Sequence, residues 1–289
     1  MRVQPAALLG TSRLCELFNE GFSDYLVTMQ LSEVAFRDHV GANDIDLDCS
    51  RVVIDDRPAA FALVARRGGA GWVGGMGTAP AYRRRGLGER ALLAGVAAAA
   101  ERGCRELWLE VIDENRAAIA LYDKLGFEVV RDLIVWSLPA QGDSVPASRP
   151  VEPEQAQAWI AAHRVSREPW QRADETLDRV RARGTRFRGL MVERDDKVAG
   201  AVVYREDADL ITTFQVAAID DDVAADVLLA AAGGARPLRL ANAPDGEAPS
   251  RALERLGAVA TARQHEMRLG LGSSGLSPGG RPGAPRSSG

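Results

Sequence analysis

The feature of this sequence that most restricts its fold is an internal repeat, which relates residues 1–138 to residues 154–270. The clearest match sets Ala120–Gly126 (ALYDKLG) against Arg251–Gly257 (RALERLG), 131 positions further along the chain. Each block has the length of an ordinary domain, about 100–150 residues. We therefore expect one fold used twice in the 289-residue chain, rather than one large domain.

The first block alternates helical and strand-like patterns in the order ααβββαβαββ. Its helices are expected at residues 12–21, 32–40, 87–102 and 116–125. Its strands are expected at residues 51–55, 59–66, 71–78 and 106–111, with a final hairpin of 127–131 and 133–138. Short turns join the first three strands, which indicates an antiparallel meander. This order predicts an α/β fold with a mixed sheet and helices on its faces.

The second block repeats the later part of this order. Helices are expected at residues 154–164, 173–183, 222–232 and 250–256, and strands at 189–193, 198–205, 210–216, 237–241 and 259–268. The segment 139–153 contains four prolines and is typical of a linker. In residues 271–289, 14 of 19 positions are Gly, Ser or Pro, which predicts a disordered tail.

Composition excludes several classes of function. The formal net charge of −4 gives no basic field for nucleic acid. The longest apolar run, Ala91–Ala100, is far shorter than the roughly 20 residues of a membrane span. No signal peptide pattern opens the chain, so we expect a cytoplasmic protein without a nucleic-acid or membrane partner. Three cysteines and three histidines are widely scattered, so neither a metal site nor a disulfide framework is expected.

The most informative local motif is Arg83–Gly88 (RRRGLG), which leads directly into the expected helix at 87–102. Glycines let an anion approach the backbone, and a helix start offers unpaired N–H groups, so the motif favours a pyrophosphate. A solvated glycine-rich turn is the simpler alternative. A dinucleotide fingerprint, Gly86-x-Gly88-x-x-Ala91 with Glu110 downstream, is a weaker alternative. That fingerprint needs a strand running almost directly into the first glycine, and here the preceding strand ends near Thr78.

Three segments together resemble the GNAT N-acetyltransferases. Gly77–Gly88 (GTAPAYRRRGLG) is similar to the acetyl-CoA motif of that family, whose core is Q/R-x-x-G-x-G/A. Leu107–Val111 and Asn115–Phe127 resemble its second signature. The resemblance covers residues 1–138 and is closest to members that acetylate the N-termini of ribosomal proteins. It implies the GNAT acyl-CoA N-acyltransferase fold in the first block, and with the repeat it implies a tandem arrangement.

The resemblance also implies a co-substrate, acetyl-CoA, and residues that hold it without a metal. Met76, Gly77 and Thr78 would contact the pantetheine arm, on a strand whose glycines favour a bulge that separates it from the strand of Glu110. An N–H near Gly77 would stabilise the oxyanion. The residues implied in pyrophosphate binding are Arg83, Arg84, Arg85, Gly86, Leu87, Gly88 and Glu89, and Asn115 is the further cofactor contact.

By the same resemblance, Glu110 is the catalytic base, acting directly or through water, and Tyr122 is the acid that protonates the CoA thiolate. Each residue also has a purely structural interpretation. Tyr122 lies beside an apolar helical stripe and would then be a core aromatic residue, and Glu110 would be a charge at a strand edge. Asn115 would cap the helix that follows it, alone or in addition to binding the cofactor.

The second block lacks these features. Ile219–Asp222 stands where the first block has its arginine–glycine loop, and carboxylates there repel a pyrophosphate. In the repeat, Leu253 takes the place of Tyr122 and Ala241 that of Glu110. The second block is therefore a degenerate GNAT-like domain, whose expected roles are packing, covering the acceptor cleft or dimer formation.

The function expected from the sequence is transfer of an acetyl group to a primary amine through a ternary complex. Acetylation of a protein N-terminus is one alternative, and a non-catalytic acyl-CoA sensor is another. The acceptor, a small amine or a peptide, would be bound by residues of the first helices and a neighbouring strand, namely Phe22, Asp24, Tyr25, Phe36 and Trp72. The chain is expected to be a monomer with a pseudo-dimeric fold, or a homodimer.

Overall fold

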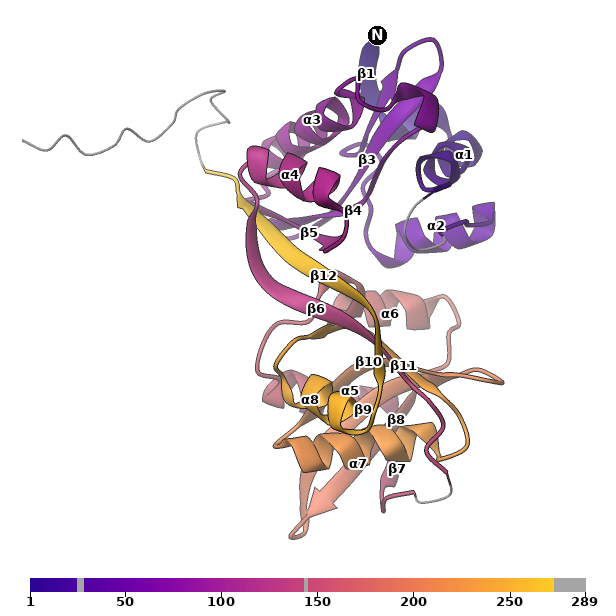
Figure 1. The fold of residues 1–289 in the computed structure, drawn as a ribbon, viewed down its shortest axis with the longest axis vertical. Helices are drawn as coiled ribbons and strands as arrows, with labels where there is room; N and C mark the ends of the chain where they lie inside the picture. The colour runs from indigo at the N-terminus through magenta and orange to yellow at the C-terminus, as the bar shows by residue number, and fades with distance from the viewer. Residues whose placement is uncertain (25–28, 143–144, 273–289) are drawn as a thin grey trace, which may run out of the picture. The chain divides into compact units, whose positions relative to one another are not determined.

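The computed structural model describes residues 1–24, 29–142 and 145–272, which form two compact units (Figure 1). The first unit contains Met1–Thr28, Asp46–Trp108 and the described end of the chain from Leu269. The second unit contains Met29–Ile45 and Leu109–Arg268. These units differ from two consecutive blocks, since each takes segments from distant parts of the sequence.

The first unit is built on strands that neighbour one another in sequence order. They are β1 (Arg2–Pro5), β2 (Arg51–Ile54), β3 (Pro58–Arg67), β4 (Ala70–Thr78) and the start of β5 (Glu106–Ile112). Its helices are η1 (Ala6–Leu9), α1 (Thr11–Gly21), η2 (Pro80–Tyr82) and α3 (Leu87–Glu101). Both α1 and α3 pack against β3, whose residues 59–65 are all buried (Figure 1). Because side chains of a strand alternate between faces, helices cover both faces of this sheet.

Strand β4 contains a β-bulge at Gly74. In the antiparallel pairing of β3 with β4, Leu63 lies opposite Gly75 and Val64 opposite Val73, so that Gly74 is the additional residue. A Cβ at Gly74 would lie 2.3 Å from the Trp72 ring, which explains why this position requires glycine. The parallel pairing of β4 with β5 covers residues 70–72 and 106–108. The bulge predicted from the glycines is therefore confirmed.

The second unit holds the strands in the order β12-β6-β11-β10-β9-β8-β7. These are β6 (Glu128–Leu138), β7 (Arg149–Val151), β8 (Arg188–Arg194), β9 (Lys197–Glu206), β10 (Ile211–Ala218), β11 (Leu238–Pro244) and β12 (Val259–Gly270). The helices are α2 (Glu33–Ala42), α4 (Arg116–Lys124), α5 (Pro153–His163), η3 (Trp170–Arg172), α6 (Asp174–Ala182), α7 (Asp221–Ala232) and α8 (Ala248–Arg255). Val202 and Val203 of β9 belong to two different hydrophobic clusters, so this sheet has a core on each face.

Residues 29–45 belong to the second unit through specific contacts. The indole Nε1 of Trp170 donates to the carbonyl of Asn43 at 2.9 Å, and Trp170 is buried. Arg179 of α6 forms an ion pair with Asp44. The loop that follows α2 is therefore anchored to η3 and α6.

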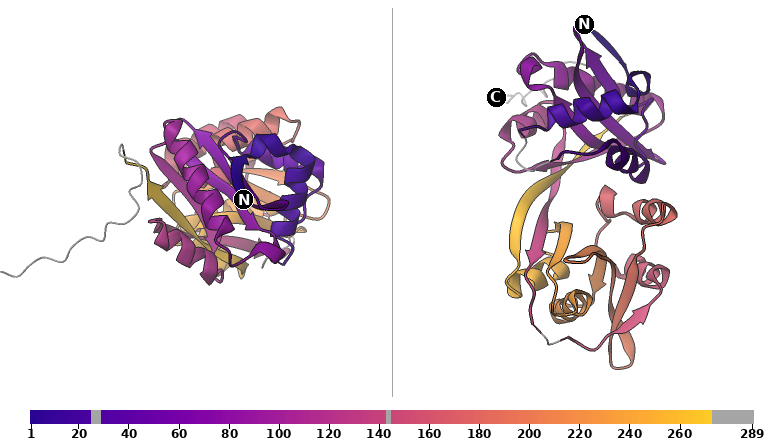
Figure 2. Two further views of the ribbon diagram at one scale, coloured as in Figure 1. Left: turned by 90° about the horizontal axis from the view of Figure 1, so that it is seen from above. Right: turned by 90° about the vertical axis from the view of Figure 1, so that its right-hand side faces the viewer.

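The hairpin expected at 127–138 is wrong, because residues 128–138 form the single strand β6. Asp132, at the expected turn, instead pairs with His265 at 2.6 Å across the β6–β12 ladder. In the same ladder Val130 is the additional residue of a β-bulge in β6. β6 also pairs with β11 along its other edge. Figures 1 and 2 show β6 and β12 as long strands side by side. The last strand of the chain thus completes a ladder with a strand of the first sequence block.

The local elements otherwise follow the sequence closely. Ser32 caps α2 by accepting a hydrogen bond from the N–H of Ala35, as its position predicted. Strand β1 was not expected, since it is short and lies just before a turn of 3₁₀ helix. Strand β7 lies within the segment expected to be a linker. The expected tail falls almost entirely on residues 273–289, which lie outside the described residues.

Candidate active site

The loop between η2 and α3 has an unusual backbone conformation. Arg84 and Gly86 both adopt the left-handed region, with φ of 58° and 73°. Gly86 is the N-cap of α3, and as a glycine it has no side chain to accept a hydrogen bond from the first turn of that helix. The first N–H groups of an α-helix have no partner within the helix. The start of α3 therefore presents donors and the positive end of a helix dipole to whatever lies before it.

Two glycines shape this loop for different reasons. A Cβ at Gly86 would meet no atom within 4 Å, so the space before the helix is open. A Cβ at Gly88 would lie 2.9 Å from Thr78 Oγ1 and 3.0 Å from Met76 Cε. The first turn of α3 thus packs directly on the end of β4. The residues implied in binding the pantetheine arm and those implied in binding the pyrophosphate are neighbours within the first unit.

The three consecutive arginines of this loop have different surroundings. Arg83 forms a bidentate ion pair with Asp24, and its Nε donates to the carbonyl of Thr78 at 3.2 Å. The hydrogen bonds from Arg83 hold the pKa of Asp24 below its usual value. Arg85 donates to Asp55 at 2.7 Å, and its guanidinium lies 5.4 Å from the centre of the Tyr82 ring. Both arginines are therefore held by the protein itself.

Arg84 is exposed like Arg85 but, unlike its two neighbours, has no ion pair within the described part of the chain. Its positive charge is available to a ligand in front of α3. Leu87 is buried beneath the helix start, and Glu89 is half-buried in its first turn. An open space, uncapped N–H groups and one available guanidinium fit a pyrophosphate group.

The residues implied in proton transfer and in the remaining cofactor contact lie in the second unit. Glu110 is half-buried on β5. Asn115 caps α4, because its side-chain oxygen accepts from the N–H of Ala118 at 3.2 Å. Tyr122 is 7% exposed, with its ring centre 5.7 Å from that of Phe127. The expected capping role of Asn115 is confirmed, and the catalytic roles of Glu110 and Tyr122 stay predictions.

The residues expected to bind the acceptor are mostly core residues. Phe22, Phe36 and Trp72 are at most 8% exposed, and the ring of Phe22 packs 4.7 Å from that of Phe18. Tyr25 lies outside the described residues. Within the described ranges there is no cluster of His, Cys, Asp and Glu that could hold a metal ion. No helix in those ranges is long and apolar enough to span a membrane.

The equivalent helix start in the second unit is closed by its own side chains. Asp220 caps α7, and its carboxylate accepts from the N–H of Val223 at 2.8 Å. Asp221 pairs with Arg251 at 2.6 Å. Three carboxylates at this position leave no binding site for an anion. The interpretation of this loop as a lost phosphate site is therefore supported by its hydrogen bonds.

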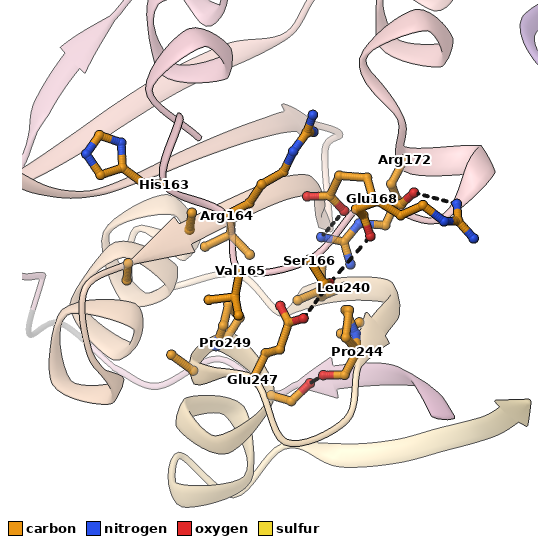
Figure 3. A pocket seen from close by; sticks show the side chains of 17 residues that line it. His163, Arg164, Val165, Ser166, Glu168, Arg172, Leu240, Pro244, Glu247 and Pro249 are labelled. Atoms are coloured by element: carbon orange, nitrogen blue, oxygen red, sulfur yellow. Dashed lines mark hydrogen bonds and ion pairs between the residues drawn. The ribbon is translucent and has the colours of Figure 1, made fainter. Parts of the chain in front are cut away.

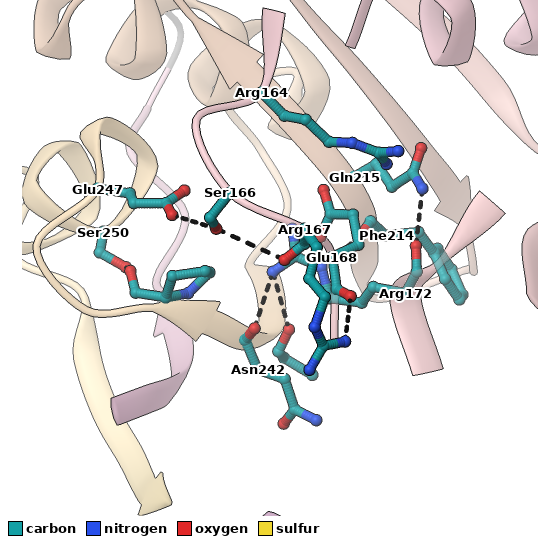
Figure 4. Close-up of polar contacts among 12 residues, drawn as sticks. Arg164, Ser166, Arg167, Glu168, Arg172, Phe214, Gln215, Asn242, Glu247 and Ser250 are labelled. Carbon is teal, nitrogen blue, oxygen red and sulfur yellow. Dashed lines mark hydrogen bonds and ion pairs between the residues drawn. The ribbon is translucent and has the colours of Figure 1, made fainter. Parts of the chain in front are cut away.

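The strands of the second unit repeat the geometry of β4 and β5. Residues 211–213 of β10 pair in parallel with residues 238–240 of β11, and Phe214 then forms a bulge against β9. Beyond this pairing, Arg172 connects the two strands (Figure 4). Its guanidinium donates to the carbonyls of Phe214 (2.7 Å), Asn242 (3.1 Å) and Ala241 (3.3 Å). Its charge is balanced by Glu168 at 3.1 Å, and both side chains are buried.

Sequence reasoning missed Arg172, because a lone arginine after Trp170 carries no motif. The registers agree with one expected equivalence. Gly74 and Phe214 are the bulge residues of β4 and β10, so Gly71 corresponds to Ile211. Their parallel partners are Leu107 and Leu238, which makes Ala241 the counterpart of Glu110. The conclusion that the second block lacks the base is unchanged.

A sequence model of the acetyltransferase (GNAT) family matches residues 12–127. A ribosomal protein bS18-alanine N-acetyltransferase of Salmonella typhimurium is 38% identical over 96 residues, which are 33% of this chain and 63% of that enzyme. The chain thus spans less than two thirds of that relative's length.

Solved structures resemble the chain over most of its length. A putative acetyltransferase from Pyrococcus horikoshii has a TM-score of 0.66 at 18% identity, covering 93% of this chain and 89% of the other. A tandem GNAT protein from the clavulanic acid biosynthesis pathway has a TM-score of 0.67 at 16% identity, covering 94% and 99%. At such identities the likeness concerns the fold, and it supports a GNAT fold that occurs twice.

Proposed function

Residues 12–127 of this chain belong to the GNAT acetyltransferase family, and on this basis we propose that the chain transfers an acetyl group from acetyl-CoA to a primary amine. The observation that carries the proposal is the uncapped start of α3 behind Arg84. The equivalent helix α7 is capped by Asp220, so the first copy of the fold is the one that binds the cofactor.

Each part of the cofactor has residues that suit it. The N–H groups from Gly86 to Glu89 and the Arg84 guanidinium hold the pyrophosphate, while Arg83 and Arg85 keep the loop in place through their acidic partners. Met76–Thr78, at the end of β4, contact the pantetheine arm through main-chain hydrogen bonds. The N–H near Gly77 stabilises the oxyanion that forms on the thioester carbonyl.

The reaction requires two proton movements. An alkyl ammonium, with a pKa of about 10, loses a proton to Glu110, directly or through water. The neutral amine attacks the thioester carbonyl, the N–C bond forms and the C–S bond breaks. Tyr122 gives its phenolic proton to the departing thiolate, and the second proton that the nitrogen loses on becoming an amide is returned, through water, to the Tyr122 oxygen. Asn115, at the start of α4, provides the remaining cofactor contact.

The acceptor is a small amine or the N-terminal amine of a peptide. The peptide alternative is favoured by the 38% identity with an enzyme whose name specifies an alanine of a ribosomal protein. We place the reaction in the cytoplasm, where the three buried thiols Cys15, Cys49 and Cys104 stay reduced. We further propose that the chain works as a monomer whose two copies form a pseudo-dimer, or as a homodimer.

Release of CoA from acetyl-CoA, measured with a panel of small amines and alanine-initiated peptides, tests this function. We expect Tyr122→Phe and Glu110→Ala each to lower turnover about a hundredfold, the usual contribution of one general acid or base. The matched controls are Tyr204→Phe, at another buried tyrosine, and Glu106→Ala, on the same strand as Glu110. Turnover that survives both test variants would refute the assigned roles. Tight acetyl-CoA binding without turnover on any amine would favour the non-catalytic sensor.

A further inference from the structure

The second unit contains a pocket that is partly open to solvent, and its lining residues are shown in Figure 3. It lies where the ends of β10 and β11, the start of α8 and the segment between α5 and η3 meet. Its apolar wall is formed by Val216, Leu240, Ala243, Pro244 and Pro249. Nothing in the proposed acetyl transfer uses this pocket.

The cationic groups that line the pocket are already bound within the protein. Arg164 donates to Asp174 at 3.0 Å. Arg167 donates to the buried carboxylate of Glu266 at 2.7 Å and to the carbonyl of Glu168 at 3.1 Å. Arg172 donates to Glu168 and to the strand carbonyls described above. Few donors are therefore left for an anionic ligand.

The hydrogen-bond acceptors of the pocket, in contrast, can accept further hydrogen bonds from a ligand. Arg131 donates to the hydroxyl oxygen of Ser166. The Ser166 hydroxyl in turn donates to Glu247 Oε1 at 2.5 Å (Figure 4). Glu247 Oε2 has no hydrogen bond or ion pair with any described residue. His163 Nδ1 lies 2.8 Å from the carbonyl of Trp159 and must donate to it, which leaves Nε2 of the neutral ring as an acceptor.

We propose that this pocket binds a small molecule that carries a primary amine on an apolar body. Its ammonium donates to Glu247 beside Ser166, and its hydrocarbon part lies against the wall of β10, β11 and Pro249. The ligand is held without acetyl-CoA, so the site is independent of the proposed reaction.

Titration calorimetry of the full chain, without acetyl-CoA, tests this site with three probes of equal chain length. We expect n-hexylamine to bind at least tenfold more tightly than n-hexanol, and n-hexanoate to bind most weakly. Glu247→Gln should reduce n-hexylamine affinity to that of n-hexanol. Glu254→Gln, an exposed carboxylate on the same helix α8, should leave all three affinities unchanged.

A second variant separates this pocket from any other amine site. Ala248→Phe, at a half-buried lining residue, fills the pocket and should weaken n-hexylamine and n-hexanol together by at least tenfold. Equal affinity for the three probes would overturn the proposal. So would n-hexylamine binding that neither Glu247→Gln nor Ala248→Phe reduces, in variants whose melting temperature matches that of the parent chain.

Discussion

Helices α3 and α7 begin at equivalent places in two copies of one fold, yet their first turns are completed in opposite ways. The N-cap of α3 is Gly86, which has no side chain to offer, whereas the N-cap of α7 is Asp220, whose carboxylate binds the helix itself. An anion site at a helix start is thus made by leaving the donors unpaired. One carboxylate is enough to close it.

The strands beside these helices also differ in whether a side chain of the protein stands at the equivalent place. In the first copy, Gly74 forms the bulge of β4 without a side chain. In the second copy, Phe214 forms the bulge of β10, and the guanidinium of Arg172 binds the carbonyls of β10 and β11. The second copy therefore joins these two strands with one of its own side chains.

The largest effect is expected from the residue that closes the second copy. Arg172→Met leaves the buried carboxyl group of Glu168 without its ion-pair partner, so the free energy of unfolding should fall by about 3–5 kcal/mol. Urea unfolding followed by tryptophan fluorescence measures this loss. The double variant Arg172→Met with Glu168→Gln carries no buried charge and should recover part of the stability. A loss below about 1 kcal/mol in the single variant would show that Arg172 does not hold the two strands together.

Charge reversal in the first copy is expected to have the next largest effect. Arg84→Glu removes a charge-assisted hydrogen bond and adds a like charge, so the Kd for acetyl-CoA should rise about a hundredfold. The melting temperature should not change, since Arg84 makes no ion pair with the described residues. Calorimetric titration with acetyl-CoA measures the effect, and Arg13→Glu on the exposed face of α1 is the matched control. Unchanged affinity would remove this loop from the cofactor site.

A smaller effect is expected at the cap of α7. Asp220→Ala removes the hydrogen bond to Val223 and should cost about 1 kcal/mol, or a few degrees of melting temperature. Acetyl-CoA binding should stay at the parent level, because Arg172 still occupies the space between the strands. Differential scanning calorimetry gives the first result and titration the second. If this variant bound acetyl-CoA at an additional site, Arg172 would not be what prevents binding in the second copy.

The smallest effect is expected two residues further along, at Asp222. Asp222 pairs with Arg255 at 2.9 Å, but its side chain is 85% exposed. Exposed ion pairs contribute little, so Asp222→Ala should change the free energy of unfolding by about 0.5 kcal/mol or less. The same calorimetric measurement checks it. A loss as large as that of Asp220→Ala would mean that the aspartates of this loop act together rather than through one cap.

The local parts of this molecule were predictable from sequence, because their causes are local. Ser32 and Asn115 cap helices through residues three positions ahead, and the strand meander follows from alternation and short turns. The pairing of β6 with β12 was not predictable in this way. It depends on contacts such as Asp132 with His265, which are 133 positions apart.

The candidate site shows the same division. Gly86 and Gly88 were identified from their spacing and adopt the geometry that an anion site needs. The sequence could not separate Arg84 from its neighbours, since Asp24 and Asp55, which hold Arg83 and Arg85, lie far away along the chain. The role of Arg172 was not predictable, because its hydrogen bonds to the carbonyls of Phe214 and Asn242 join residues that are far apart in the sequence.

The pairing of β6 has a consequence for synthesis on the ribosome. β6 ends at residue 138, while its two neighbours begin at residues 238 and 259. At about 5–20 residues per second, β6 remains without either neighbour for at least about 5 seconds after it is made. Charged residues on a strand discourage wrong pairing at an open edge, and Arg131 and Asp132 stand in the middle of β6. The sheet of the second unit therefore closes only after β11 and β12 have been synthesised.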